Sequence, residues 1–319
     1  MARQTKSRPP KVRQTQYPKR RATRPRPPWW LYGSAAVGLL GLAAALALIT
    51  FRSGEGSSGG SSSGHEASAG LPDTPDYHSL LVNPRNPRKL VLGTHVGLYI
   101  SSDGGRHWRF DALSGDDAMN LARPAGKTVW LAGHNVFKKS SDGGSAWSDV
   151  RPSGLPGLDI HGFAVDPGNP KTLYAAVAGQ GLYRSRDGGE SFSLVSRQVG
   201  GNVMALAVLP GGRILAGDMQ RGLVESPDGG ASWKQRLRAQ LIGLAVNPSD
   251  PKRILATGAG IALSTNGGRT WRSVLDLTDG AGPVAWSTSD PKLAYAVGFN
   301  RNLYRSTDRG ASWQPVEGS

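Results

Sequence analysis

Short runs of apolar residues, separated by polar turns, recur along the chain from about residue 78 onward. Residues 160–198 show the pattern plainly, as IHGFAVDP, NPKTLYAAVAG, GLYRS and ESFSLVS. Such runs, rich in branched and aromatic residues and bounded by Gly, Pro, Asn and Asp, are typical of β-strands. Groups of four runs return at intervals of roughly 40 residues, which is the length of one propeller blade. The pattern therefore predicts an all-β protein made of four-stranded antiparallel blades.

One eight-residue phrase marks every repeat. It occurs as SSDGGRHW, SSDGGSAW, SRDGGESF, SPDGGASW, STNGGRTW and STDRGASW. Because strand-like runs lie on both sides of the phrase, we expect it to form the turn of a hairpin. There the hydroxyl and carboxylate accept backbone N–H groups, and Gly adopts positive φ. This interpretation gives the acidic position a structural role, not a catalytic one, at Asp103, Asp142, Asp187, Asp228, Asn266 and Asp308.

The phrase resembles the Asp-box, and residues 78–317 resemble the BNR/Asp-box propellers. That superfamily includes sialidases, endo-xyloglucanases, sortilin-type receptors and seven-bladed photosystem II assembly factors. The whole arrangement is similar to bacterial membrane-anchored Asp-box propellers that are catalogued as glycosyl hydrolases. The resemblance implies ligand binding on the face opposite the Asp-boxes, here called the top face. Six phrases predict a six-bladed propeller.

The N-terminal part of the chain differs from the rest. Residues 1–28 contain ten of the 38 Lys and Arg residues and no acid, so they predict a basic, disordered arm. Residues 29–52 contain an uncharged stretch long enough to cross a bilayer, and residues 53–70 form a Gly/Ser linker before the propeller at 71–319. The positive arm predicts a single-pass anchor with a cytoplasmic N-terminus and an extracytoplasmic propeller. A cleaved signal peptide is the alternative.

Charge and composition limit the kinds of partner and of chemistry that the propeller can have. Most of the net charge of +15 comes from the arm, so the propeller is not expected to bind nucleic acid. The chain has no cysteine, which excludes disulfides, zinc–thiolate sites and thiol nucleophiles.

The predicted top face collects an unusual set of side chains. Aligning the first strand of each repeat gives equivalent positions to His78, Met119, His161 and Met204. The loops between second and third strands add further candidate ligand-binding residues, namely His95, His134, Arg221 and Arg301. One interpretation is a polar rim with Met119 and Met204 packed in strands. The other is a transition-metal site of imidazole and thioether groups, for which copper is the best-matched ion.

A glycoside hydrolase would need paired carboxylates on that face, and the candidates are Asp117, Asp159 and Asp218. The propeller has few glutamates, and the Phe/Tyr-Arg-hydrophobic-Pro motif of sialidases is missing, which argues against a sialidase. The sequence therefore favours a membrane-anchored platform that binds a ligand or protein without catalysis. A glycoside hydrolase and a copper-binding protein are the alternatives.

Overall fold

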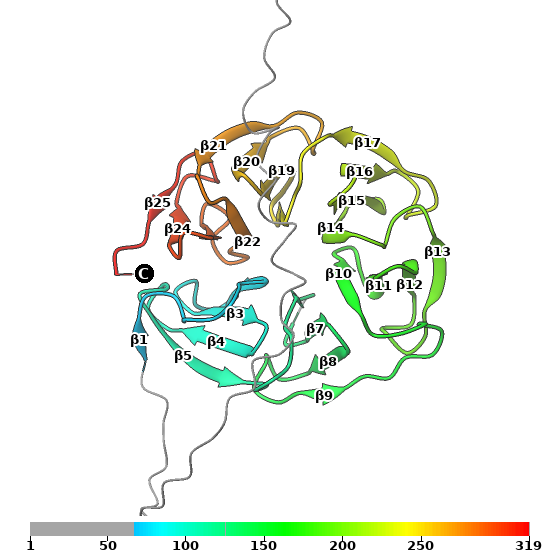
Figure 1. Ribbon diagram of the computed structural model, residues 1–319, viewed down its shortest axis with the longest axis horizontal. Coiled ribbons are helices and arrows are strands. Elements are labelled where there is room, and N and C mark those ends of the chain that lie inside the picture. The colour runs from blue at the N-terminus through cyan, green and yellow to red at the C-terminus, as the bar shows by residue number, and fades with distance from the viewer. Residues whose placement is uncertain (1–66, 125, 319) are drawn as a thin grey trace, which may run out of the picture.

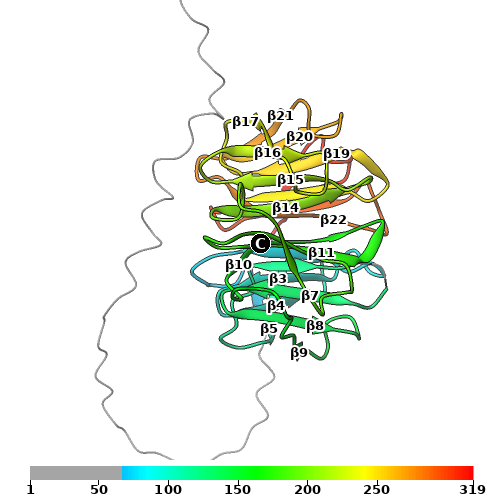
Figure 2. The same ribbon diagram turned by 90° about the vertical axis from the view of Figure 1, so that its right-hand side faces the viewer.

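The computed structural model describes residues 67–124 and 126–318. Figure 1 shows six small sheets arranged as blades around a central axis, and Figure 2 shows the ring from its side. Every neighbouring strand pair within a sheet is antiparallel. The prediction of a six-bladed, all-β propeller with four-stranded blades is confirmed. No helix among the described residues is long and apolar enough to span a membrane, and the predicted anchor at 29–52 lies outside those residues.

Each blade uses four strands in chain order, from the innermost to the outermost. The strands of blades 1 to 3 are β2 (Ser79–Val82), β3 (Leu90–Thr94), β4 (Gly97–Ser101), β5 (His107–Ala112), β6 (Asn120–Ala122), β7 (Val129–Gly133), β8 (Val136–Ser140), β9 (Ser148–Asp149), β10 (Ile160–Asp166), β11 (Asn169–Val177), β12 (Gly181–Ser185) and β13 (Ser193–Ser196). Those of blades 4 to 6 are β14 (Val203–Leu209), β15 (Arg213–Asp218), β16 (Gly222–Ser226), β17 (Lys234–Leu237), β18 (Gly243–Asn247), β19 (Asp250–Thr257), β20 (Gly260–Ser264), β21 (Arg272–Asp276), β22 (Ala281–Trp286), β23 (Ala294–Gly298), β24 (Leu303–Ser306) and β25 (Gln314–Pro315).

Blade 1 has a fifth, outermost strand. β1 (Ser68–Ala69) pairs antiparallel with β5, with Ser68 opposite Trp108. This strand begins within residues 53–70, which the sequence assigned to the linker. The outer edge of a sheet offers unpaired N–H and C=O groups, so a short extended segment beside it gains hydrogen bonds without needing apolar residues. The hydrophobic pattern therefore gives no sign of β1.

The ring closes between blades 1 and 6 by apolar packing. One hydrophobic cluster joins Leu71, Tyr77 and Leu92 to Tyr295 and Leu303, and all five are at least nine-tenths buried. The hydroxyl of Tyr295 also donates a hydrogen bond to the Pro87 carbonyl. Among the residues that the structure describes, each sheet comes from one continuous stretch of chain, and no strand is exchanged between the first and last blades.

The Asp-box forms the predicted turn between the third and fourth strands. In blade 1, the Ser101 hydroxyl donates to Asp103 Oδ1 at 2.9 Å and accepts from the backbone N–H of Gly105. Asp103 Oδ1 also accepts the backbone N–H groups of Arg106 and His107. The same pairing of Ser with Asp or Asn recurs in the other five blades.

The second glycine of the Asp-box leaves room for the preceding blade. A Cβ at Gly105 would lie 2.0 Å from Leu303, and one at Gly189 would lie 2.7 Å from the ring of Trp130. Gly230, Gly268 and Gly310 face blades 3, 4 and 5 in the same way. The glycine before it has a different role, because in blade 6 Arg309 replaces it and still has a φ of 64°.

We predict that Gly189→Ala destabilises the protein more than Gly188→Ala. Both positions have positive φ, which is strained for alanine by about 1–2 kcal/mol. Only the first substitution forces a methyl group against Trp130, which adds about 1–3 kcal/mol of overpacking, whereas Gly188 faces open space. Urea unfolding of the two variants measures the difference. Equal losses of stability would show that the contact between blades does not need this glycine.

The turn hydrogen bonds also lower the pKa of the Asp-box carboxyls. Hydrogen bonds from the side chain and backbone of Ser232 and from the Ser226 hydroxyl lower the pKa of Asp228 from 3.8 to about 2. The pKa of Asp308 is likewise about 2, because hydrogen bonds from Ser312 and Ser306 outweigh the effect of burial.

We predict acid destabilisation between about pH 4 and pH 2. As the pH falls through 3.8, these carboxyls become protonated in the unfolded chain, whereas in the folded chain they stay ionised until about pH 2. The unfolded state therefore binds more protons, and the free energy of unfolding decreases over this range. In Asp228→Asn the decrease should be shallower, because the variant lacks one of the titrating carboxyls. The turn should still form, since Asn can keep the acceptor oxygen as Asn266 does. Thermal unfolding at several pH values measures both slopes. Identical slopes would contradict a role for this carboxyl.

Candidate functional site

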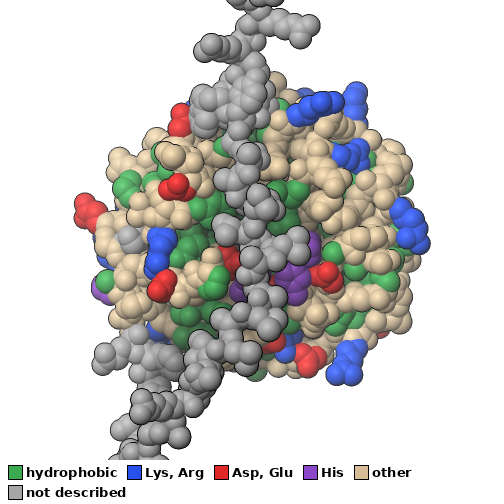
Figure 3. Space-filling model, viewed as in Figure 1, with side chains coloured by type: hydrophobic (Ala, Val, Ile, Leu, Met, Phe, Trp, Pro, Cys, Tyr) green, Lys and Arg blue, Asp and Glu red, His purple; other side chains and the backbone are tan. Residues whose placement is uncertain are grey.

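Four histidines gather on the top face near the axis of the ring. His95 and His134 occupy the two-residue loops between β3 and β4 and between β7 and β8. His78 directly precedes β2, and His161 is the second residue of β10. In an antiparallel blade these positions lie at the end opposite the Asp-box turns. The space-filling view shows histidine at the centre of this face (Figure 3).

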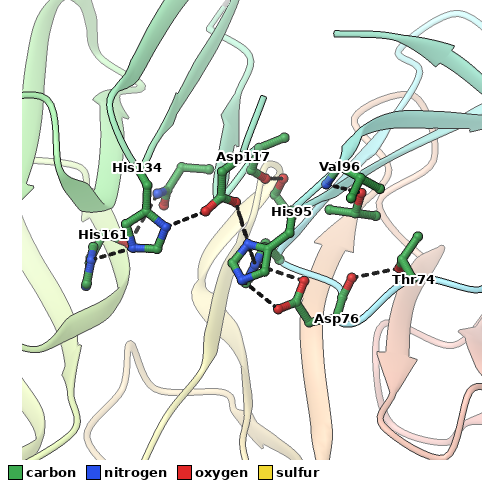
Figure 4. A network of polar contacts seen from close by, with 12 residues as sticks. Thr74, Asp76, His95, Val96, Asp117, His134 and His161 are labelled. Atoms are coloured by element: carbon green, nitrogen blue, oxygen red, sulfur yellow. Dashed lines mark hydrogen bonds and ion pairs between the residues drawn. The ribbon is translucent and has the colours of Figure 1, made fainter. Parts of the chain in front are cut away.

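The histidines form two close pairs. His78 Nε2 lies 2.8 Å from His95 Nδ1, and His134 Nε2 lies 3.0 Å from His161 Nε2. Figure 4 shows that Asp117 lies between the pairs. Its Oδ1 is 2.9 Å from His95 Nδ1, and its Oδ2 contacts His134 Nδ1.

Two more carboxylates complete the network. Asp76 lies 3.1 Å from His78 Nε2 through Oδ1 and 2.9 Å from His95 Nε2 through Oδ2. Asp159 Oδ1 lies 3.1 Å from His161 Nε2 and 3.5 Å from His134 Nε2. The result is one continuous group of four imidazoles and three carboxylates, here called the His/Asp network, built from blades 1, 2 and 3.

Close backbone packing fixes the position of Asp117. The chain leading into blade 2 runs against blade 1, where the N–H of Ala118 donates to the Thr94 carbonyl and the Ser79 hydroxyl donates to the Ala118 carbonyl. A Cβ at Gly133 would lie 1.9 Å from the Asp117 carbonyl oxygen, so only glycine fits directly before His134. The packing of this segment against blade 1 therefore brings Asp117 beside His95 of the neighbouring blade.

Burial and charge act in opposite directions within the network. Burial lowers the pKa of His161, the nearby charge of His134 lowers it further, and Asp159 partly offsets both. Burial raises the pKa of Asp76, but the close contacts and attraction of the His78 and His95 imidazoles outweigh it, so the pKa of Asp76 lies below its ordinary value. Asp117 is the most buried carboxylate of the three, with 9% of the residue exposed.

The sequence analysis did not select Asp76, although the chain contains a signal for it. Asp76 and Asp159 each stand two residues before a histidine at the same place in their repeats, and Asp117 stands two residues before Met119. Residues two apart in an extended segment lie on the same side of the chain. The repeated spacing of acid and histidine in blades 1 and 3 therefore indicates a shared site. Each aspartate taken alone resembles an ordinary turn residue.

Three other residues predicted for the top face, Arg221, Arg301 and Asp218, make their contacts outside this network. Arg301 pairs with Asp73 at 2.8 Å, and Arg221 donates a hydrogen bond to the Gln198 carbonyl. Asp218 accepts the backbone N–H groups of the next loop, those of Gln220 and Arg221, which is the behaviour of a turn residue.

The two predicted thioether ligands, Met119 and Met204, take no part in the polar contacts described above for the His/Asp network. Met119 is buried, and Met204 is half-buried near the start of β14. Within residues 67–124 and 126–318, neither thioether sulfur has a polar contact. The groups that the structure brings together are imidazoles and carboxylates.

Glu225, the glutamate on a third strand, is held in a buried ion-pair group. Its oxygens contact Arg213 Nη1 at 3.1 Å and Arg236 Nε at 2.6 Å, and its side chain is 6% exposed. Burial raises the pKa of Glu225, but the two arginines outweigh that effect and leave the pKa below its ordinary value. This carboxylate is therefore a structural anion within blade 4.

The repeated turns, the six sheets and the polar top face define a BNR/Asp-box propeller. A family model described as "Photosynthesis system II assembly factor YCF48" matches residues 81–318, and the chain belongs to this family.

Individual relatives agree with this assignment. The chain is 27% identical over 240 residues to the photosystem II assembly lipoprotein Ycf48 of Synechococcus sp. (strain CC9902), covering 70% of each chain. It resembles a solved structure of YCF48 bound to D1 peptide with a TM-score of 0.52 and 22% identity, covering 79% of this chain and 84% of that one. It also resembles the GH74 xyloglucanase from Xanthomonas campestris, with a TM-score of 0.55 and 19% identity, over 79% of this chain and 47% of the enzyme. These two structural likenesses show the fold.

We predict that Glu225→Gln lowers the free energy of unfolding by about 1–3 kcal/mol, because it removes the carboxylate that pairs with the partly exposed Arg213 and Arg236. Asp73→Asn is the control, since it breaks an exposed pair with Arg301 worth about 0–1 kcal/mol. Chemical denaturation compares the two variants. A Glu225→Gln variant as stable as the control would show that the carboxylate is not structurally required.

Proposed function

We propose that this protein is a membrane-tethered, extracytoplasmic platform that binds a peptide segment of a partner protein on its top face without catalysis. The observation that carries the proposal is the shortness of the loops that join second and third strands on that face. The six loops between second and third strands are only two to four residues long. Small-molecule sites are usually deep and enclosed, whereas loops of this length leave a low surface suited to a macromolecule.

The family relationship supports a protein partner. The Synechococcus relative is named as an assembly lipoprotein, and a structural neighbour was solved as YCF48 bound to D1 peptide. By analogy, the partner of this chain would be a membrane protein that presents an exposed peptide. The analogy is one of fold and family, so the residues that would make contact must be argued from this chain.

The contact region would be the His/Asp network and its rim. Val96 follows His95 directly and is one of two large apolar residues that are exposed among the described ones. An exposed apolar side chain beside a charged and polar centre is a common composition for a protein-binding surface. On blade 3, the exposed Gln180 lies in the equivalent loop.

The tether is part of the proposal. Residues 29–52 are uncharged up to Arg52 and follow a strongly basic arm, and the linker to residue 70 is rich in Gly and Ser. An anchor of this type would place the propeller within reach of peptide segments at the membrane surface. The name of the Synechococcus relative, a lipoprotein, is consistent with a family that works beside membranes.

The glycoside hydrolase alternative has less support. Of its candidate carboxylates, Asp218 is used by its own turn, and Asp117 and Asp159 both contact imidazoles. The loops between second and third strands, two to four residues long, also supply little material to wall a saccharide cleft. The likeness to the xyloglucanase covers 47% of that enzyme, so this chain spans about half its length.

Site-specific photo-crosslinking in native membranes tests the proposed platform. A photoreactive amino acid at Val96 or Gln180 should give discrete crosslinks to a membrane protein. The same residue at Ser145 or Arg186, exposed in the Asp-box turns of blades 2 and 3, serves as the matched control and should give none. Mass spectrometry identifies the crosslinked peptides.

Two outcomes would contradict the proposal. Equal crosslinking from both faces would remove the top face as the specific surface. Hydrolysis of xyloglucan oligosaccharides by the purified chain, abolished in Asp117→Asn, would favour the enzyme instead.

A further inference from the structure

We propose that the His/Asp network binds two divalent transition-metal ions side by side, one between His78 and His95 and one between His134 and His161. Zn²⁺ is the ion class that fits best. This inference goes beyond partner binding and does not depend on it.

The first subsite has four candidate donor atoms from blades 1 and 2. His78 Nε2 lies 2.8 Å from His95 Nδ1, 3.1 Å from Asp76 Oδ1 and 3.7 Å from Asp117 Oδ1. Donors around a tetrahedral Zn²⁺ ion are separated by about 3.3 Å, given bond lengths near 2.0–2.1 Å. The separations of His78 Nε2 from His95 Nδ1 and from Asp76 Oδ1 are close to that value, and Asp76, His78 and His95 each offer a donor atom within 4.8 Å of the other two, so a small adjustment would place an ion among them.

The second subsite has three candidate donor atoms from blades 2 and 3. His134 Nε2, His161 Nε2 and Asp159 Oδ1 are separated from one another by 3.0, 3.1 and 3.5 Å. A single proton can satisfy only one contact in such a triangle, and the other two bring lone pairs together. A cation satisfies all three at once. Three protein donors would leave a position open to water or to a partner's side chain.

Two buried oxygen atoms give independent support. Asp76 Oδ1 and Asp117 Oδ1 are shielded from solvent and have no hydrogen-bond partner. Their nearest imidazole nitrogens lie at 3.1 and 2.9 Å, but not in hydrogen-bonding geometry. Buried carboxylate oxygens are rarely left unsatisfied, because the loss of hydration is costly. Both of these oxygens border the first subsite, where a metal ion would complete their coordination.

The outer contacts also match a metal site. His95 directs Nδ1 to the first subsite, and its Nε2 lies 2.9 Å from Asp76 Oδ2. His134 directs Nε2 to the second subsite and contacts Asp117 Oδ2 through Nδ1. Metal-binding histidines usually donate their other N–H to a carboxylate, which fixes the ring and its tautomer. Asp117 therefore connects the subsites, because one oxygen borders the first and the other orients a ligand of the second.

Donor type and charge select the ion. Imidazole and carboxylate donors suit Zn²⁺, whereas thioether would be needed to favour Cu⁺ and an all-oxygen shell to favour Ca²⁺ or Mg²⁺. This donor set shifts the sequence-based expectation from copper to zinc. The three carboxylates Asp76, Asp117 and Asp159 offset most of the charge of two divalent ions.

Metal titration of the full chain, purified in mild detergent and stripped with a chelator, tests the inference. Calorimetry with Zn²⁺ should give two ions per chain, and Co²⁺ should give the visible spectrum of a tetrahedral N/O site. His78→Ala and His161→Ala should each retain one ion, and Asp117→Asn should weaken binding by about 10–100-fold. His107→Ala is the matched control, because this histidine lies in the blade 1 Asp-box and pairs there with Asp103 at 2.7 Å. It should leave both ions bound.

The wild-type stoichiometry decides the inference even if a variant fails to fold, which circular dichroism without metal would show. Fewer than two Zn²⁺ ions bound by the wild type would overturn it. Two ions that persist in well-folded His78→Ala and His161→Ala would also overturn it, since binding would then lie elsewhere. Loss of one ion in each variant, with His107→Ala unchanged, is the result that the geometry requires.

Discussion

Close contact between the Asp-box turn and the preceding blade, made through the second glycine in five of the six blades, is the constraint on which the ring depends. The second glycine of the turn leaves space that Leu303 fills beside blade 1 and Trp130 fills beside blade 3. The first and last blades therefore meet through the same type of contact as blades in the middle of the chain. Since interiors pack densely, a side chain at this glycine would shift one blade relative to the next. Any such shift would reach the top face, where the His/Asp network takes residues from three blades.

The same short hairpins that make the ring regular also make the top face rigid. His95 and His134 lie in two-residue loops whose ends are fixed by strand pairing. Backbone hydrogen bonds also hold the neighbouring chain against them, such as the one that the Ala118 N–H donates to the Thr94 carbonyl. A site built on such loops is held in place before a ligand arrives, which reduces the ordering cost of binding. Short loops and a preformed polar centre would suit both the proposed protein partner and the proposed ions.

The sequence predicts the fold well, because the repeated phrase reports hydrogen bonds within one turn. Local chemistry at Ser101 and Asp103 is enough to predict that turn, and its recurrence predicts the number of blades. Repeat alignment also assigns His78, His95, His134 and His161 to one face.

The sequence does not predict which of the top-face side chains contact one another. The contact of Asp117 with His95 depends on how tightly blades 1 and 2 pack, and the position of each side chain on the top face depends on which way it turns toward the axis. Asp76 shows the difficulty best. Alone it is an ordinary loop aspartate, and its role is visible only when its two-residue spacing from His78 is compared with that of Asp159 from His161.

Each blade is built from an uninterrupted stretch of chain, and β1 joins the outer edge of the blade that follows it instead of completing the last one. Within residues 67–124 and 126–318, no blade therefore combines strands from the two ends of the described chain. The natural break between blades 6 and 1 is topologically equivalent to every other boundary between blades. Circular permutation at any of these boundaries would preserve all the ladders within the sheets. The fold therefore does not require that the chain begin with this particular blade.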